Sequence, residues 1–311
     1  MKRIVFLLPI LLLSSCSPSK LALKTSTYAF STLFDIRLYE GEQKDLDNIV
    51  SIIQDIEASL SSHDKNAELY KLNNDRKIDN PSIYLKESLS IGLDIEKRMD
   101  TFSIYLGSLK QKWMDSLSNN KVLGQDEINI ELGKIKGTYI DISSNSITLE
   151  GEGSIDLGSI GKGYCLDKIK EYLCNKNISS YLVSAGSSSS IFGDLENNNF
   201  KVTLRDYPSR QLNIKNAGLS ISSIFEQKYE IDGEIYSHII NPKNGNSRPM
   251  YQYSLILDSK MDNKFPSTYI DGYSTGFINM DMESIKDFAK EYGYKIAIGN
   301  DDIIYSSDGL F

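Results

Sequence analysis

The chain has 311 residues, of which 40% are hydrophobic and 24% are charged. This is the composition of an ordinary globular protein, so it excludes a chain that is disordered throughout and leaves room for one large domain or two smaller ones. The formal net charge of −8, with no basic stripe along the chain, argues against a nucleic-acid partner.

The N-terminus has the pattern of an export signal. A short positive segment at 1–3 precedes an apolar stretch at 4–13 that is too short to span a bilayer. The sequence Leu13-Ser14-Ser15-Cys16 resembles a bacterial lipobox, which implies cleavage before Cys16 and acylation of its thiol. An ordinary signal peptide with an incidental cysteine is the alternative.

This pattern predicts three segments: a lipoprotein signal peptide at 1–15, a lipidated tether at 16–24 and a folded domain at 25–311. The mature protein would be exported and anchored to a membrane by its lipid, on the outer side of the cytoplasmic membrane or in the periplasm.

Hydrophobic periodicity predicts strands and helices in alternation along the folded domain. The clearest helix covers 45–60, where Ile49, Ile53 and Ile56 keep helical spacing. In chain order we expect a strand at 27–40, this helix, a loop at 61–66, a helix from about 81 to 98, a hairpin at 139–149, a strand at 181–183, strands at 200–205, 211–215 and 219–223, a hairpin at 228–238, a strand at 252–258, helices at 272–279 and 281–292, and a strand at 294–299.

The chain contains no internal repeat and no Pro/Ser-rich linker. We therefore predict an α/β (α+β) fold, with mixed sheets and flanking helices in a single domain of at most two lobes around a cleft.

The stretch from 154 to 174 is the most informative part of the sequence. It reads as a short strand, a turn with three glycines between 158 and 163, and an amphipathic helix. Glycines let the backbone approach a ligand, and a helix N-terminus favours an anion. Lys162 adds a positive charge, and Asp156 adds a carboxylate six residues earlier. The turn suits a phosphate-bearing ligand, with or without a metal, although a glycine-rich corner without a ligand would have the same pattern.

Two further motifs follow this corner. Segment 238–245 (His-Ile-Ile-Asn-Pro-Lys-Asn-Gly) leaves a predicted hairpin, and segment 271–275 (Asp-Gly-Tyr-Ser-Thr) enters a predicted helix. Together with 156–164 (Asp-Leu-Gly-Ser-Ile-Gly-Lys-Gly-Tyr), and in this order, they resemble the three main motifs of the ApbE family, the FAD:protein FMN transferases. The resemblance extends from about 25 to 293.

The resemblance implies a magnesium site made by Asp271, Thr275, Ser274 and the backbone carbonyl of Ser159. One carboxylate with hydroxyls and a carbonyl suits Mg²⁺, which prefers oxygen ligands and leaves positions to water or phosphate. Without the other motifs, helix N-capping would be the preferred explanation of Asp271 and Thr275.

The resemblance also implies that FAD binds as substrate. Lys162 would lie near its diphosphate, Asp156 would face the same ligand, and Phe30 would pack on the flavin or adenine ring. Four more residues would line the cleft: Thr101, Phe102, Ser103 and Ile240.

His238 is the candidate general base, because an imidazole titrates near neutrality and could take a proton from an acceptor hydroxyl. A histidine at a strand end that is bonded only to backbone is the alternative.

The implied reaction is the Mg²⁺-dependent transfer of FMN from FAD to a Thr or Ser hydroxyl of an acceptor protein, with release of AMP. Two alternatives remain open. One is an Mg²⁺-dependent FAD pyrophosphatase that yields FMN and AMP, and the other is a lipoprotein that binds FAD without turnover. Intact Asp271, Thr275 and His238 favour an enzyme over a binding protein.

Overall fold

The computed structural model describes residues 22–196 and 198–311. The predicted signal peptide and the lipidation of Cys16 lie outside the described residues. The first strand, β1 (Leu23–Ala29), begins where Leu23 pairs with Leu38 and packs against the core. Residues 23 and 24, which we assigned to the tether, are therefore part of the fold.

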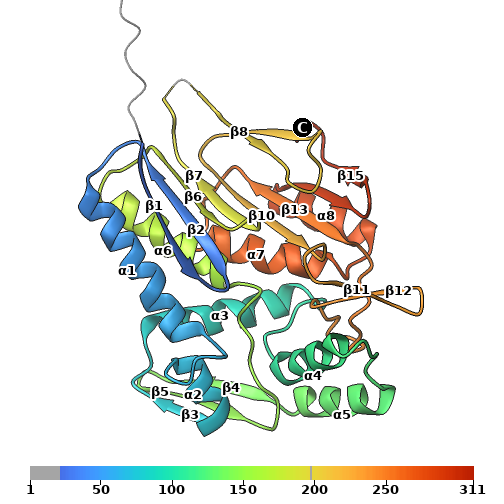
Figure 1. The fold of residues 1–311 in the computed structure, drawn as a ribbon. Coiled ribbons are helices and arrows are strands. Elements are labelled where there is room, and N and C mark those ends of the chain that lie inside the picture. The colour runs from blue at the N-terminus through green and yellow to red at the C-terminus, as the bar shows by residue number, and fades with distance from the viewer. Residues whose placement is uncertain (1–21, 197) are drawn as a thin grey trace, which may run out of the picture.

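An eight-stranded sheet forms the centre of the molecule (Figure 1), with strand order β1-β2-β6-β7-β10-β13-β14-β15. Every pairing between these strands is antiparallel. Besides β1, the strands are β2 (Thr32–Leu38), β6 (Tyr181–Ala185), β7 (Ser189–Phe192), β10 (Ala217–Ser223), β13 (Tyr253–Asp258), β14 (Lys295–Gly299) and β15 (Ile303–Ser306).

The predicted strand at 27–40 is in fact a tight hairpin of β1 and β2. Phe30 and Ser31 form its two-residue loop, and both have positive φ, 51° and 57°. Such a loop matches the twist of the flanking strands but usually contains Gly or Asn, so neither residue signals the reversal in the sequence. The backbone N–H of Phe30 donates to Glu57 Oε1 at 2.6 Å, which fixes the loop against helix α1 (Gln43–Leu60).

The central strands of the sheet, above all β13, are buried on both faces. On β13, Ile256 faces a core cluster formed with the helices, whereas Tyr253, Leu255 and Leu257 face a cluster on the opposite side. The first face is covered by α1, α6 (Gly161–Asn175), α7 (Pro266–Phe277) and α8 (Met282–Tyr292). The other face is covered by the hairpin of β8 (Phe200–Thr203) and β9 (Gln211–Ile214). Figure 1 shows α6 and α7 side by side along the sheet.

A second group of elements lies beside the helical layer (Figure 1). In it, Trp113 stacks on Tyr236 with ring centroids 5.8 Å apart and donates from Nε1 to the Gly245 carbonyl at 2.8 Å, so the predicted 228–238 hairpin is fixed against α4. The group consists of α2 (Glu68–Asp75), β3 (Lys77–Asp79), α3 (Ile83–Arg98), α4 (Gly107–Ser118), α5 (Gln125–Lys136), β4 (Tyr139–Ile142), β5 (Ser146–Glu150), β11 (Lys228–Ile231) and β12 (Glu234–Ser237).

The α/β (α+β) fold class is confirmed, and one helix boundary changes the interpretation of a motif. Helix α7 begins at Pro266 rather than near 272, so Asp271 lies in the middle of the helix and does not cap it. The first turn of α7 is capped instead by Asp167 of α6, whose carboxylate accepts from the N–H groups of Ser267 and Thr268 at 2.9 and 2.8 Å. N-capping therefore does not explain Asp271 or Thr275.

Within residues 22–196 and 198–311, none of the helices combines the length and the apolar character needed to cross a bilayer.

Candidate active site

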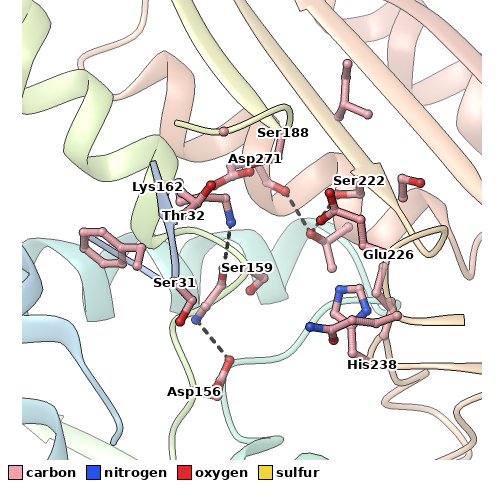
Figure 2. A pocket seen from close by; sticks show the side chains of 18 of the residues that line it. Ser31, Thr32, Asp156, Ser159, Lys162, Ser188, Ser222, Glu226, His238 and Asp271 are labelled. Atoms are coloured by element: carbon pink, nitrogen blue, oxygen red, sulfur yellow. Dashed lines mark hydrogen bonds between the residues drawn. The ribbon is translucent and has the colours of Figure 1, made fainter. Parts of the chain in front are cut away.

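A cavity of about 480 Å³ opens where the β1–β2 hairpin tip, the turn from β6 to β7 and the end of β10 meet the start of α6. Of the twelve site residues predicted in the described chain, eleven line it, from Phe30 at one end of the sequence to Thr275 at the other. Figure 2 shows Asp156, Lys162, His238 and Asp271 around this space, from three segments that lie far apart in the sequence. The exception is Ser274, which is fully buried behind the cavity wall.

The glycine corner is joined directly to helix α7. The backbone N–H of Gly163 donates to Asp271 Oδ2 at 2.9 Å across 108 residues of sequence. A Cβ on Gly163 would lie 2.3 Å from the Ser267 carbonyl oxygen, so only glycine lets α6 and α7 come this close. The corner and the C-terminal motif, which the sequence placed in separate elements, thus form one wall.

Buried hydroxyls hold the other oxygen of Asp271. Ser189 from β7 and Ser220 from β10 donate to its Oδ1 at 3.0 and 3.1 Å. Ser274 donates to the Asp271 carbonyl at 3.0 Å and is within hydrogen-bond distance of Ser220 and Ser222. This network orients the Asp271 carboxylate, and Ser274 belongs to the support behind it rather than to the cavity lining.

The donor set at this wall fits a hard cation. Thr275 donates its hydroxyl proton to the Asp271 carbonyl at 3.1 Å and lies 3.1 Å from Ser222 Oγ, so its Oγ1 keeps at least one lone pair for an ion. Asp271, Thr275 and Ser159 line the same cavity. No three His, Cys, Asp or Glu side chains form a metal-type cluster in the described chain, so an ion here would be held by one carboxylate together with hydroxyl, carbonyl and ligand oxygens, as Mg²⁺ prefers.

The side chain of Asp156 binds the backbone of the glycine corner and a lysine of α4. Its Oδ1 accepts from the backbone N–H of Gly158 at 3.0 Å and from Lys110 Nζ at 2.9 Å. Burial alone would raise the pKa of this carboxyl, but Lys110 and the Gly158 N–H outweigh burial and lower it. Asp156 is therefore a carboxylate at neutral pH. Lys162 Nζ lies on the other side of the turn, 3.5 Å from the Gly158 carbonyl oxygen.

His238 follows β12 directly and lines the cavity. The segment is held by Ser237, whose N–H donates to the Ser247 carbonyl at 3.0 Å and whose hydroxyl accepts from the Ile239 N–H at 3.2 Å. The Nδ1 atom of His238 is buried and has no hydrogen-bond partner among the described residues. Burial, with Lys110 and Lys162, lowers its pKa to about 4. The imidazole is therefore neutral at pH 7, and it is not the backbone-bonded strand-end histidine that we considered as an alternative.

An apolar and aromatic side completes the cavity. A Cβ on Gly161 would lie 3.0 Å from Phe30 Cε1, so the ring covers the start of α6 closely. Phe102 and Ile240 are only 4% and 5% exposed. Thr101 Oγ1 is buried without a partner among the described residues. A planar ligand with polar ring atoms could contact all of these groups.

Sequence reasoning missed several residues of the site. Lys110 belongs to α4, which periodicity did not separate from its surroundings, and Ser189 and Ser220 look like ordinary strand residues. Arg205 and Glu226 form an ion pair at the cavity lining. The serine-rich turn before β7 also reaches the site, where Gly186, Ser187 and Ser188 line the cavity.

Comparison with known proteins gives consistent results. A model of the ApbE family matches residues 30–298. A protein of Haemophilus influenzae named FAD:protein FMN transferase is 22% identical over 292 residues, which cover 86% of this chain and 81% of that protein. A Klebsiella pneumoniae protein of the same name is 25% identical over 151 residues, which cover 46% of this chain and only 41% of that relative.

Solved structures show the same fold. The ApbE protein of Thermotoga maritima superposes with a TM-score of 0.76 at 18% identity, over 89% of this chain and 94% of that chain. The flavin transferase ApbE of Vibrio cholerae gives 0.76 at 18% identity, over 93% of this chain and 98% of that chain.

Proposed function

The chain belongs to the ApbE family, and on this premise we propose that it transfers FMN from FAD to a Thr or Ser hydroxyl of an acceptor protein and releases AMP. The relatives named FAD:protein FMN transferase support the donor and the transferred group. The single observation that carries the proposal for this chain is the hydrogen bond from Gly163 to Asp271 at 2.9 Å. It brings the glycine corner, which suits an anion, and Asp271, the candidate cation ligand, to one cavity.

The donor would bind with its diphosphate between these two segments. Lys162 stands at the N-terminus of α6, where the helix dipole and its ammonium group both favour phosphate oxygens. The flavin or adenine ring would contact Phe30 and Phe102 on the apolar side. The binding energy of these rings orients the phosphorus for attack.

Asp271, Thr275 and the carbonyl of Ser159 are the residues that would hold Mg²⁺. When bound, the ion would offset the negative charge of the diphosphate. The protein's own contribution is a preorganised carboxylate, since both oxygens of Asp271 are already fixed by Gly163, Ser189 and Ser220.

The transfer step exchanges a phosphoanhydride bond of FAD for a phosphoester bond to the acceptor. The acceptor hydroxyl oxygen bonds to the FMN-side phosphorus, and the bond from that phosphorus to the bridging oxygen breaks, so AMP leaves with the bridging oxygen. His238 accepts the hydroxyl proton and returns it to solvent. Its pKa, lowered to about 4 by burial and by the two nearby lysines, leaves the imidazole neutral at pH 7 with a lone pair for this proton. The negative charge of a bound diphosphate would raise that pKa toward the operating pH, where a general base works best.

We further propose that the protein works outside the cytoplasm. The lipobox-like sequence that ends at Cys16 supports export and acylation of that cysteine. The acceptor would then be a protein reachable from the same membrane surface. Labelling with a radioactive fatty acid in cells tests this, and a Cys16→Ser variant that is labelled as strongly as the native chain would refute it.

The transfer is tested by incubating the full chain with FAD, Mg²⁺ and a peptide that carries the family's acceptor pattern. We expect the peptide to gain the mass of FMN less one water, and AMP to accumulate in an equal amount. The same peptide with its acceptor Thr replaced by Ala should gain nothing. FMN and AMP released without any peptide product would instead indicate a pyrophosphatase, and intact bound FAD would indicate a binding protein.

Two variants connect the reaction to the site. Asp271→Ala should abolish turnover, whereas the matched control Asp287→Ala, an exposed residue of α8, should retain it. His238→Ala should slow transfer more than it weakens FAD binding. Unchanged turnover in Asp271→Ala would exclude the cation site, and equal losses of rate and binding in His238→Ala would make that residue structural.

A further inference from the structure

Lys110 is placed in the cavity by a rigid connection. The first residue of α4, Gly107, donates its N–H to the Ser154 carbonyl at 3.0 Å, and a Cβ on Gly107 would lie 2.6 Å from Ser154 Oγ. The start of α4 is thus fixed to the chain that leads into the glycine corner. Lys110, one turn later, lines the cavity with a side chain that is 31% exposed.

Two ammonium groups therefore flank Gly158. Lys110 Nζ lies 3.3 Å from where a Cβ on Gly158 would be, and Lys162 Nζ lies 3.5 Å from the Gly158 carbonyl oxygen. The two lysines come from different helices, α4 and α6. The backbone of Gly158, at the predicted diphosphate site, thus has two ammonium groups close to it, one from each helix.

The charge balance of this region depends on Lys110. Lys162 alone would face the two carboxylates of Asp156 and Asp271, which would repel a dianionic diphosphate. With Lys110 present, two ammonium groups balance the carboxylates of Asp156 and Asp271. The same cavity is also lined by Arg205, Asp206 and Glu226. A lysine ammonium has three donors, and among the described residues the ammonium of Lys110 bonds only to Asp156, at 2.9 Å.

Resting on the proposed function, we propose that Lys110 is a second cationic residue for the diphosphate of the donor. It stays bonded to Asp156 and directs its remaining N–H groups to a phosphate oxygen. The role of Asp156 follows from this arrangement: it holds both the Gly158 N–H and the Lys110 ammonium in place. Lys110 is thereby a determinant of specificity for nucleotides with a diphosphate over the bare isoalloxazine.

The same position makes His238 a reporter of Lys110. The charged groups that act on His238 are Lys110 from α4, Lys162 from α6 and Asp156 from the corner. Removing the ammonium of Lys110 should raise the pKa of the His238 imidazole, which the NMR titration of its ring protons measures directly. This shift would place the Lys110 ammonium near His238, and the ligand-binding comparison below separates a role toward phosphate from a purely structural ion pair.

The test compares binding of FAD, ADP and riboflavin to the full chain by calorimetry. In Lys110→Met, affinity for FAD and ADP should fall roughly ten- to a hundredfold, the size expected for one hydrogen bond between charged groups. Riboflavin, which has no phosphate, should bind within about threefold of the native value. Lys110→Arg should recover most of the loss. The control is Lys112→Met on the same helix, because Lys112 pairs with Glu131, which also pairs with Lys134.

Three outcomes would overturn the proposal: unchanged FAD affinity in Lys110→Met, an equal loss for riboflavin and FAD, or no recovery in Lys110→Arg. Thermal unfolding of each variant checks that the fold is intact, and Lys110→Gln is the second choice if Met destabilises it. If the native chain binds FAD in a Lys110-dependent manner but transfers nothing, the proposed function fails while the role of Lys110 stands. If the native chain binds neither FAD nor ADP, both statements are overturned.

Discussion

Replacing Gly163 by Ala tests the contact on which the site depends. This glycine lies on α6 where that helix crosses α7, and it supplies the N–H that binds Asp271. An added Cβ would lie 2.3 Å from the Ser267 carbonyl oxygen and 2.8 Å from Asp271 Cβ, whereas ordinary contacts begin at 3.4 Å. The obstacle is backbone, which cannot rotate away, so the two helices must separate by about an ångström.

Two opposing contributions set the expected change in stability. Alanine favours a helix interior over glycine by about 1 kcal/mol, whereas overpacking a well-packed core costs about 1–3 kcal/mol and occasionally more. Because the close contact is with backbone, we expect the upper part of that range and a net loss of roughly 1–2 kcal/mol. The matched control is Gly133→Ala on α5, where a Cβ would meet nothing within 4 Å in the described chain. That variant should be stabilised by up to about 1 kcal/mol.

The Gly163→Ala variant should lose more transfer activity than its loss of folding stability alone would cause. Moving Asp271 by about an ångström from its donors can reduce a rate roughly 10²-fold, because catalysis depends on placement. Urea denaturation gives the free energies of unfolding of both variants, and FMN transfer at a temperature where both are folded gives the rates. If Gly163→Ala and Gly133→Ala behave alike in both assays, the contact between α6 and α7 does not position the site.

Four further predictions concern His238, Asp167 and Ser31. Because the pKa of His238 is lowered to about 4, the acid limb of kcat/KM should lie near pH 4; a limb near 6.5 would contradict the buried environment. The unfolded chain protonates this histidine at higher pH than the folded chain does, so relative to His238→Gln the native protein should lose stability as pH falls from about 6.5 to 4. Asp167→Ala leaves three donors of Ser267 and Thr268 buried and should cost at least about 2 kcal/mol in urea denaturation; a loss below about 0.5 kcal/mol would disprove the cap. Ser31→Gly relieves a positive φ of 57° and should raise the unfolding free energy by about 0.5–1 kcal/mol, and a destabilised variant would show that the hydroxyl matters more than the backbone.

Local patterns in the sequence identified elements that depend on near neighbours. The spacing of Ile49, Ile53 and Ile56 predicted α1 because all three pack on one face, and they are fully buried. The Asp232-Gly233 pair predicted the turn between β11 and β12, where both residues have positive φ. The β1–β2 turn was missed because Phe30 and Ser31 adopt the same backbone region without the residues that usually mark it.

Some residues of the candidate site could also be predicted from local sequence patterns, and others could not. Three short sequence motifs predicted that Asp156, Lys162, His238 and Asp271 belong to one site. In the structure these four residues line one cavity. Ser274, which we also predicted at the cation site, is buried behind the cavity lining. The packing of α7 against its neighbouring strands decides which of its side chains faces the cavity, and the motif alone does not show this.

The amino-acid sequence by itself determined the family, the order of the motifs and the helices and strands whose periodicity is strong. Only the tertiary structure decided that Ser189 and Ser220 hold Asp271 and that Lys110 reaches Asp156. These contacts join residues 46 to 82 positions apart, and the partners stand on separate strands and helices. Hydrogen bonds of this kind depend on how the elements pack, and no spacing within a single segment encodes them.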